Sequence, residues 1–271
     1  MKKSVLVVFG GQSSEHIVSC MSAINVIKNI DTERYDVTLI GITEEGKWLL
    51  VDSVEQIEDE SWRKNTTTAI LSPDATEKSV IVLKDGKAEM IRIDVVFPVL
   101  HGLWGEDGTI QGLFEMARIP YVGCGVLGSA VCMDKAVANA LMDAAGVPHC
   151  KWVAASRADL ELNGPVVLDG IEAKLGYPIF VKPANAGSSV GISKAADRAA
   201  LEKGVEIALR EDDKVVFEEF IDAQEVECAA IGNPDDPASV MTTRPGEILA
   251  GAEFYTYDDK YKNGVSQTVI P

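Results

Sequence analysis

A loop rich in glycine and serine, between Lys182 and Gly191, carries the clearest chemical signal in the sequence. Gly187 and Gly191 allow the backbone to approach a ligand closely, and Ser188 and Ser189 supply hydroxyl and N–H donors for phosphate oxygens. Lys182, at the end of a β-branched run, adds a positive charge. In a Walker A loop, by contrast, the lysine follows the glycines and a helix comes next. The segment predicts a phosphate-binding loop; taken alone, it is also compatible with a flexible hairpin turn.

Acidic residues follow at the end of a second apolar strand, KVVFEEFI (214–221). Glu218 and Glu219 lie at the strand end, and Ile221 after them offers an apolar wall to a purine. Glu225 is placed to hold ribose hydroxyls. Without the loop upstream, a solvated acidic edge is the simpler interpretation of the same residues.

Lys135 opens a helical segment directly after Asp134. A lysine in the first turn opposes the helix macrodipole, which favours anions at that end. The position hints at an anionic partner, and a solvent-exposed lysine is the alternative.

The bulk composition excludes several classes of protein. The 271 residues are 46% hydrophobic and 25% charged, typical of a soluble globular protein, and the formal net charge of −17 disfavours nucleic-acid binding. No run approaches the roughly 20 apolar residues that span a bilayer. The five cysteines are scattered, which argues against disulfides and a structural zinc site and favours the reducing cytoplasm.

The first 125 residues alternate between strands and helices, which predicts a Rossmann-like, doubly wound parallel sheet. In such sheets ligands bind at the carboxyl ends of the strands. The expected strands are 4–11, 35–43, 93–102 and 119–124; the expected helices are 15–27, with Ser13 or Ser14 as N-cap, and 111–120.

The second half has a different pattern, which predicts an α+β domain with antiparallel pairing. Its expected elements are a helix over 133–148 closed by Gly146, strand–loop–strand over 177–195, a helix over 195–212, strands 214–221 and 225–232, and a loop over 258–267. We therefore divide the chain into an N-terminal domain (1–125), a central subdomain (126–213) and a C-terminal subdomain (214–271).

Six segments together resemble the D-alanine–D-alanine ligases of the ATP-grasp superfamily, in family order and spacing across essentially the whole chain. They are FGGQSSEHIVS (9–19), HGLWGEDGTIQG (101–112), CMDK (132–135), VKPANAGSSVGI (181–192), FEEF (217–220) and FYTYDDKY (254–261). The pattern HG…GEDGT…QG is specific to this family. The resemblance implies an α/β N-terminal domain followed by an α+β ATP-grasp domain that is incomplete at its C-terminus.

The resemblance also implies the chemistry, a cytoplasmic step in making peptidoglycan precursors. ATP would phosphorylate the carboxylate of a first D-alanine, and the amine of a second would attack the acyl phosphate. Lys135 and Lys182 would contact the phosphates. Glu15 would bind the ammonium group of the first D-alanine, and His101 would lie near that substrate.

The remaining implied roles concern the nucleotide and a lid. Glu218, Glu219 and Ile221, beside Phe254, would line the adenine pocket. Glu225 would hold ribose. Lys260 would approach the γ-phosphate and the carboxylate of the second substrate. Ser188 would link Glu15 to Tyr261, so that the 254–267 loop closes over the site and excludes water.

Magnesium is the second implied cofactor, but the family's metal ligands lie beyond Pro271, so no metal ligand is named in this chain. We therefore expect the 271-residue chain to be inactive by itself. The family also implies a homodimer. Three alternatives stay open: a D-alanine–D-serine ligase, a non-catalytic ATP-binding remnant, and another ATP-grasp ligase, against which the 101–112 segment argues.

Overall fold

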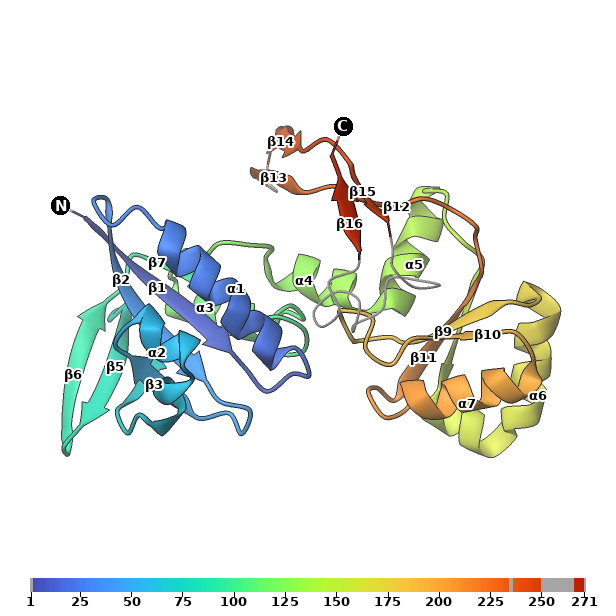
Figure 1. The fold of residues 1–271 in the computed structure, drawn as a ribbon, viewed down its shortest axis with the longest axis horizontal. Helices are drawn as coiled ribbons and strands as arrows, with labels where there is room; N and C mark the ends of the chain where they lie inside the picture. The colour runs from blue at the N-terminus through green and yellow to red at the C-terminus, as the bar shows by residue number, and fades with distance from the viewer. Residues whose placement is uncertain (1, 234–235, 250–265, 271) are drawn as a thin grey trace.

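The computed structural model describes residues 2–233, 236–249 and 266–270. A seven-stranded sheet and a four-stranded sheet lie at opposite ends of the molecule, with α4 and α5 between them (Figure 1). Two smaller sheets follow in the last part of the chain. Within the described residues, no helix is long and apolar enough to cross a membrane.

The N-terminal sheet has the strand order β6-β5-β4-β3-β2-β1-β7. Its strands are β1 (Lys3–Gly10), β2 (Tyr35–Ile42), β3 (Trp48–Val51), β4 (Thr68–Leu71), β5 (Ser79–Lys84), β6 (Lys87–Arg92) and β7 (Val95–Pro98). β1 pairs in parallel with β2 and β7, as predicted. β3 to β6 extend the sheet in antiparallel pairs, because short turns such as the one at Gly46 reverse the chain. The predicted strand at 119–124 makes only a bridge between Val96 and Tyr121.

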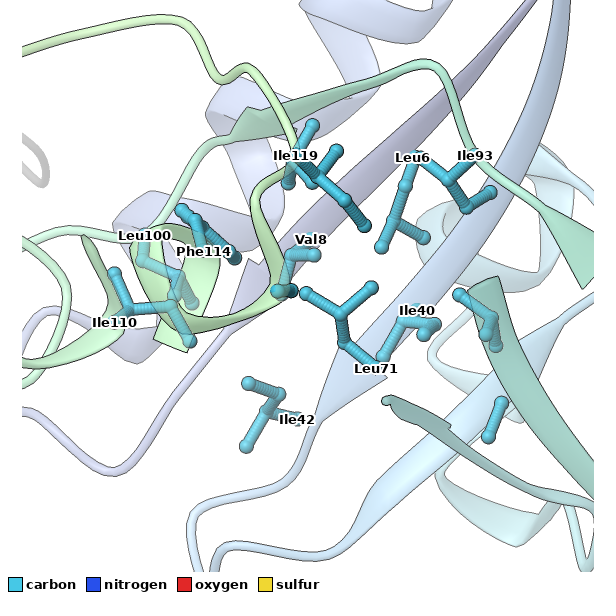
Figure 2. Close-up of a cluster of buried hydrophobic side chains, with 14 of the residues drawn as sticks. Leu6, Val8, Ile40, Ile42, Leu71, Ile93, Leu100, Ile110, Phe114 and Ile119 are labelled. Atoms are coloured by element: carbon cyan, nitrogen blue, oxygen red, sulfur yellow. The ribbon is translucent and has the colours of Figure 1, made fainter. Parts of the chain in front are cut away.

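Helices cover both faces of this sheet because β1 is apolar on both sides. Val7 and Phe9 pack in the cluster that includes α1, whereas Leu6 and Val8 pack with Phe114 of α3 (Figure 2). The helical elements of this part are α1 (His16–Asn29), α2 (Val54–Glu58), a 3-10 turn (Ser61–Lys64), α3 (Thr109–Ala117) and α4 (Val126–Met133).

The predicted serine cap of α1 is wrong. The helix begins at His16, and its N-cap residue is Glu15, which makes no side-chain capping bond. Ser13 instead accepts a hydrogen bond from the Glu15 N–H at 3.2 Å and donates one to the His101 carbonyl at 2.7 Å. The hydroxyl therefore joins the turn after β1 to the turn after β7.

The central sheet has the order β10-β9-β11-β8, and its pairs are antiparallel as predicted. The elements of this part are α5 (Lys135–Ala145), β8 (Trp152–Ser156), α6 (Arg157–Leu175), β9 (Ile179–Pro183), β10 (Ser193–Ala195), α7 (Arg198–Ala208) and β11 (Lys214–Glu219). Helices α6 and α7 pack on one face of the sheet and α5 on the other. β11 belongs to this sheet, although the proposed domain division falls at 213/214.

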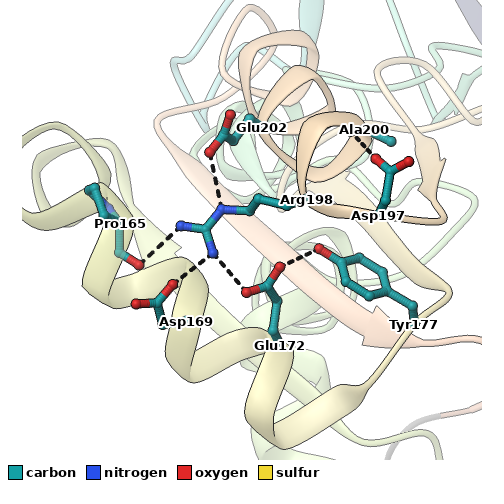
Figure 3. Close-up of polar contacts among 8 residues, drawn as sticks. All are labelled: Pro165, Asp169, Glu172, Tyr177, Asp197, Arg198, Ala200 and Glu202. Carbon is teal, nitrogen blue, oxygen red and sulfur yellow. Dashed lines mark hydrogen bonds and ion pairs between the residues drawn. The ribbon is translucent and has the colours of Figure 1, made fainter.

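Arg198 joins the two helices on the outer face of the central sheet (Figure 3). From the start of α7 its guanidinium donates to Asp169 and Glu172 of α6, each at 2.7 Å, and to Glu202 one turn further on. Its remaining nitrogen donates to the Pro165 carbonyl at 3.2 Å. The helices that back the sheet are thus fixed to each other by a charge-assisted network.

The last part of the chain forms two small antiparallel sheets: β12 (Glu225–Glu227), β15 (Gly246–Leu249) and β16 (Gln267–Val269) in one, β13 (Ala230–Asn233) and β14 (Asp236–Thr242) in the other. The strand predicted over 225–232 is therefore divided between two sheets. The loop predicted over 258–267 falls almost entirely outside the described residues.

Candidate active site

The buried carboxylate of Glu15 lies at the carboxyl end of β1. Glu15 is 3% exposed, and the hydroxyl of Ser188 donates a hydrogen bond to its Oε1. A Cβ atom added to Gly102 or Gly187 would collide with its Oε2, so backbone from two other loops closes around it. None of the ion pairs in the described ranges includes Glu15. The site is a desolvated carboxylate able to receive a cation.

The loop between β9 and β10 reaches this carboxylate in a left-handed backbone conformation. Ser188, Ser189 and Gly191 have φ of 47°, 61° and 71°. Such turns expose successive N–H groups, which suits an anion. The base of the loop is anchored because Asn185 donates from both its backbone and its side chain to one oxygen of Asp212, at 2.7 and 2.8 Å.

Two lysines flank the start of this loop. Lys135 donates from Nζ to the carbonyls of Ala186 at 2.6 Å and Ala184 at 3.4 Å. Its pKa is lowered, chiefly by burial and then by the positive charge of Lys182, against the opposing effect of Glu218 and other nearby carboxylates. Because burial and a second positive charge disfavour the protonated form of Lys135, a bound anion would stabilise that form.

Lys182 forms an ion pair with Glu218 on the neighbouring strand β11. Glu218 also accepts a hydrogen bond from Asn139 of α5 at 3.3 Å. Glu219 points the other way, because successive strand residues alternate. It accepts the backbone N–H of Lys151 at 2.8 Å and pairs with that side chain, and these contacts lower its pKa. Of the two glutamates, only Glu218 therefore shares a face with Lys182.

The structure does not bring the remaining nucleotide candidates within its described ranges together with Glu15 and the loop. Ile221 is exposed after β11, and Glu225 is exposed at the start of β12. Phe254, Lys260 and Tyr261 lie outside the described residues.

His101 lies in the turn after β7, next to the glycine turn that follows β1. Its Nε2 is 3.1 Å from the hydroxyl of Ser22 on α1. Together with Gly11 and Trp104 it lines a mostly apolar cavity of about 260 Å³. The loop after His101 is stabilised by a hydrogen bond within it, in which the Glu106 carboxylate accepts the Gly102 N–H at 2.7 Å.

Sequence reasoning missed the residues that support the site. Ser13, His16 and Ser19 are buried and bind the ends of β1 and β7, and Asp212 anchors the loop. Polar residues on the apolar side of α1 were the available signal. Their partners, however, lie as far as 80 residues away in the chain.

No group of three or more His, Cys, Asp or Glu side chains is arranged to hold a metal ion in the ranges that the structure describes. Three carboxylates near the loop have other partners: Glu218 pairs with Lys182, Glu219 accepts the Lys151 N–H, and Asp212 accepts from Asn185.

An α/β unit that presents a carboxylate to the glycine- and serine-rich loop of an antiparallel α+β unit is the architecture of the ATP-grasp ligases. The computed structure matches the VanG D-Ala:D-Ser ligase of Enterococcus faecalis with a TM-score of 0.83 and 38% identity, over 99% of this chain and 75% of that one. It matches the D-alanine–D-alanine ligase of Coxiella burnetii with a TM-score of 0.79 and 33% identity, over 92% and 71%.

Sequence comparison narrows the class to one family. Residues 4–124 match the family model described as D-ala D-ala ligase N-terminus, and residues 141–271 match the model described as D-ala D-ala ligase C-terminus. A D-alanine–D-alanine ligase from Caldicellulosiruptor bescii is 47% identical over 270 residues, which covers 100% of this chain and 73% of the relative. The chain belongs to the D-alanine–D-alanine ligase family.

Proposed function

We propose that the protein joins two D-alanine molecules in an ATP-dependent ligation. A carboxylate oxygen of the first D-alanine attacks the γ-phosphorus of ATP, and ADP leaves. The amine of the second D-alanine then attacks the acyl carbon, phosphate leaves, and the nitrogen loses a proton. The contact between Glu15 and Ser188 carries this proposal, because it joins an amino-acid-type site to a phosphate-type loop.

The amino-acid side of the site rests on charge. The buried Glu15 carboxylate lacks an ion-pair partner in the described ranges, and the ammonium group of D-alanine supplies the missing charge. Ser188 holds one oxygen of that carboxylate in place. The His101 carbonyl accepts a hydrogen bond from Ser13 in the turn that leads to Glu15, and we assign the His101 side chain to the same substrate.

The nucleotide side rests on the loop and its two lysines. The backbone N–H groups of Ser188 and Ser189 and the Ser189 hydroxyl face the phosphates, with Lys135 and Lys182 neutralising charge. Glu218, held by Lys182, is the best placed of the acidic candidates to meet the adenine amino group.

The other nucleotide and lid roles remain proposals from the sequence. They assign adenine contacts to Glu219, Ile221 and Phe254, ribose to Glu225, the γ-phosphate to Lys260 and lid closure to Tyr261. Glu219 would have to leave Lys151 to take part. ATP and D-alanine are the proposed substrates, and a homodimer in the cytoplasm is the proposed setting. Family membership also brings Mg²⁺ into the proposal, but we derive no step through it, since no described set of residues fits it.

The second candidate function is D-alanine–D-serine ligation. The observation in its favour is the likeness to the Enterococcus faecalis D-Ala:D-Ser ligase at a TM-score of 0.83. The two functions share the first substrate and differ in the second. A competition assay decides between them: the enzyme is given equal concentrations of D-alanine and D-serine, and the dipeptide products are identified by mass spectrometry.

The direct test of ligation uses two proteins: the chain itself, and the chain extended with the part of the Caldicellulosiruptor bescii relative outside the matched 73%. Each is given ATP, Mg²⁺ and either D-alanine or L-alanine. We expect the extended protein to form D-alanyl-D-alanine with equal ADP and phosphate from D-alanine, and to form no dipeptide from L-alanine. Phosphate release by the extended protein that does not depend on D-alanine would refute the function. Dipeptide formed by the chain without the added part would refute the sequence-based expectation that the chain is inactive by itself, and would leave the function standing.

A further inference from the structure

His16 is a buried histidine next to Glu15 to which the proposed reaction gives no role. It is 2% exposed, and its Nδ1 lies 2.6 Å from the carbonyl oxygen of Gly11. Because a carbonyl oxygen can only accept, Nδ1 must carry the proton. In the neutral ring, Nε2 is then the acceptor, and it lies 3.7 Å from the sulfur of Cys20 one turn along α1.

The surroundings fix the orientation of this ring. Burial raises the pKa of the Cys20 thiol to about 11, so the thiol stays protonated and donates to Nε2. Trp62 stacks on the ring at 6.1 Å between centroids and 20° between planes. A Cβ atom on Gly10 would lie 3.1 Å from Cε1 of the ring. A flipped imidazole would place the carbon Cδ2 against the Gly11 carbonyl and lose this hydrogen bond, so the bond itself favours the present orientation.

The bond from His16 to Gly11 closes the turn that presents Glu15. The turn leaves β1 at Gly10 and enters α1 at His16, and Glu15 is the last residue before the helix. Ser19 secures the same turn from below, accepting the Gly10 N–H at 2.8 Å and donating to the Val99 carbonyl at 2.5 Å. Since Glu15 makes no capping bond of its own, its placement depends on these neighbours.

We propose that His16 is a positioning residue for the ammonium site, acting through the hydrogen bond from its Nδ1 to the Gly11 carbonyl. The proposal rests on the proposed function in that Glu15 is taken to bind the ammonium group of D-alanine. His16 touches no substrate. Its effect is to hold the Glu15 carboxylate where Ser188 and the substrate meet it.

The two ring nitrogens can be separated by substitution. The amide nitrogen of asparagine reaches about the position of Nδ1, and that of glutamine about the position of Nε2. His16→Asn therefore keeps the donor to Gly11, whereas His16→Gln and His16→Leu lose it. Cys20→Ala is the matched control, because it removes only the partner of Nε2.

The experiment titrates D-alanine calorimetrically into each variant of the full chain with Mg²⁺ and a non-hydrolysable ATP analogue present, after a separate titration of the analogue. We expect His16→Gln and His16→Leu to weaken D-alanine binding about tenfold, the worth of one hydrogen bond, and His16→Asn and Cys20→Ala to stay within about twofold of wild type. Affinity for the ATP analogue should not change. His16→Asn as weak as His16→Leu, or equal losses for both ligands together with a lower melting temperature, would overturn the positioning role.

Nitrogen NMR of the imidazoles gives a readout that does not need substrate, and the chain has only three histidines. The proposal requires the Nδ1–H tautomer for His16, and an Nε2–H tautomer would overturn it. The ligation assay on the extended protein tests the proposed function separately, and the spectrum decides whether His16 closes the turn as described even if that assay fails.

Discussion

At the scale of single residues, the site depends on a buried carboxylate that has no ion-pair partner among the residues that the structure describes. Glu15 is contacted by the Ser188 hydroxyl and lies against the backbone of Gly102 and Gly187. A buried charge without a counter-charge costs free energy, and this cost falls when a cation binds. The selectivity of such a site is therefore set by the charge and hydrogen-bonding capacity of the ligand.

Removal of the Ser188 hydroxyl should weaken binding of the first D-alanine. Ser188→Gly is the cleaner variant, since glycine accepts the left-handed φ of 47° that alanine would strain. We expect the KM for D-alanine to rise about tenfold in the extended protein, with the KM for ATP changing less. Ser188→Ala should show the same loss plus strain. A wild-type KM for D-alanine in Ser188→Gly would contradict the role of the hydroxyl.

Lys135 should give nucleotide binding an unusually early alkaline limit. Burial and the charge of Lys182 lower the pKa of this lysine below its ordinary value of 10.5, and only the protonated form attracts phosphate. The affinity for an ATP analogue, measured from about pH 7 to about pH 10, should therefore decline before an ordinary lysine would titrate. Lys135→Arg keeps its charge throughout and should shift the decline upward. An unchanged alkaline limit in that variant would rule out Lys135 as the titrating group.

Residue types pointed to part of this site in advance. Ser188 and the two lysines stand out in sequence because glycines, serines or a helix start adjoin them, whereas Glu15 was named only through the family resemblance. Ser13 was predicted only as a helix cap and His16 was not singled out, because the hydrogen-bond partners of both side chains are brought near only in the folded chain.

At the scale of elements, helix α5 supports the nucleotide side through its first residue. Asp134 caps the helix by accepting the N–H groups of Ala136 and Val137, at 3.0 and 3.1 Å, and it also pairs with Lys214 of β11. Burial alone would raise the pKa of the Asp134 carboxyl, but Lys214 and the two N–H groups lower it on balance. The cap fixes the helix start from which Lys135 extends.

Asp134→Ala should destabilise the folded chain by about 1 kcal/mol, the usual value of an N-cap, as measured by urea unfolding at neutral pH. Because folding depresses the pKa of this carboxyl, its contribution is present above its ordinary value of 3.8 and is lost as the pH falls below it. The difference between wild type and Asp134→Ala should therefore shrink in acid. Asp222→Ala, at an exposed position, is the control; equal stability of the two variants at neutral pH would contradict the cap.

Element prediction succeeded where the pattern was local. The parallel strands β1, β2 and β7 and the antiparallel β9 and β11 follow from apolar runs that glycines or polar residues end. The antiparallel extension from β3 to β6 was not predicted, because its strands are short and half exposed and their pairing is set by turns rather than by composition. The split of 225–232 into two sheets likewise depends on partners later in the chain.

At the scale of the whole molecule, loops from two separate sheets contribute to one site. The bond between Ser188 and Glu15 joins residues 173 positions apart, one in the turn after β1 of the seven-stranded sheet and one in the loop between β9 and β10 of the four-stranded sheet. No local pattern places these residues together, and only the resemblance to a family suggested the pairing. The fold thus brings an amino-acid site and a phosphate loop into contact, as the ligation requires.

The most direct test of the central claim is calorimetric titration of D-alanine into wild type and Glu15→Gln, with Mg²⁺ and a non-hydrolysable ATP analogue bound. The substitution keeps the shape of the side chain and removes its charge. We expect D-alanine affinity to fall by at least about tenfold while affinity for the analogue stays unchanged. D-alanine binding by Glu15→Gln at the wild-type affinity would contradict it.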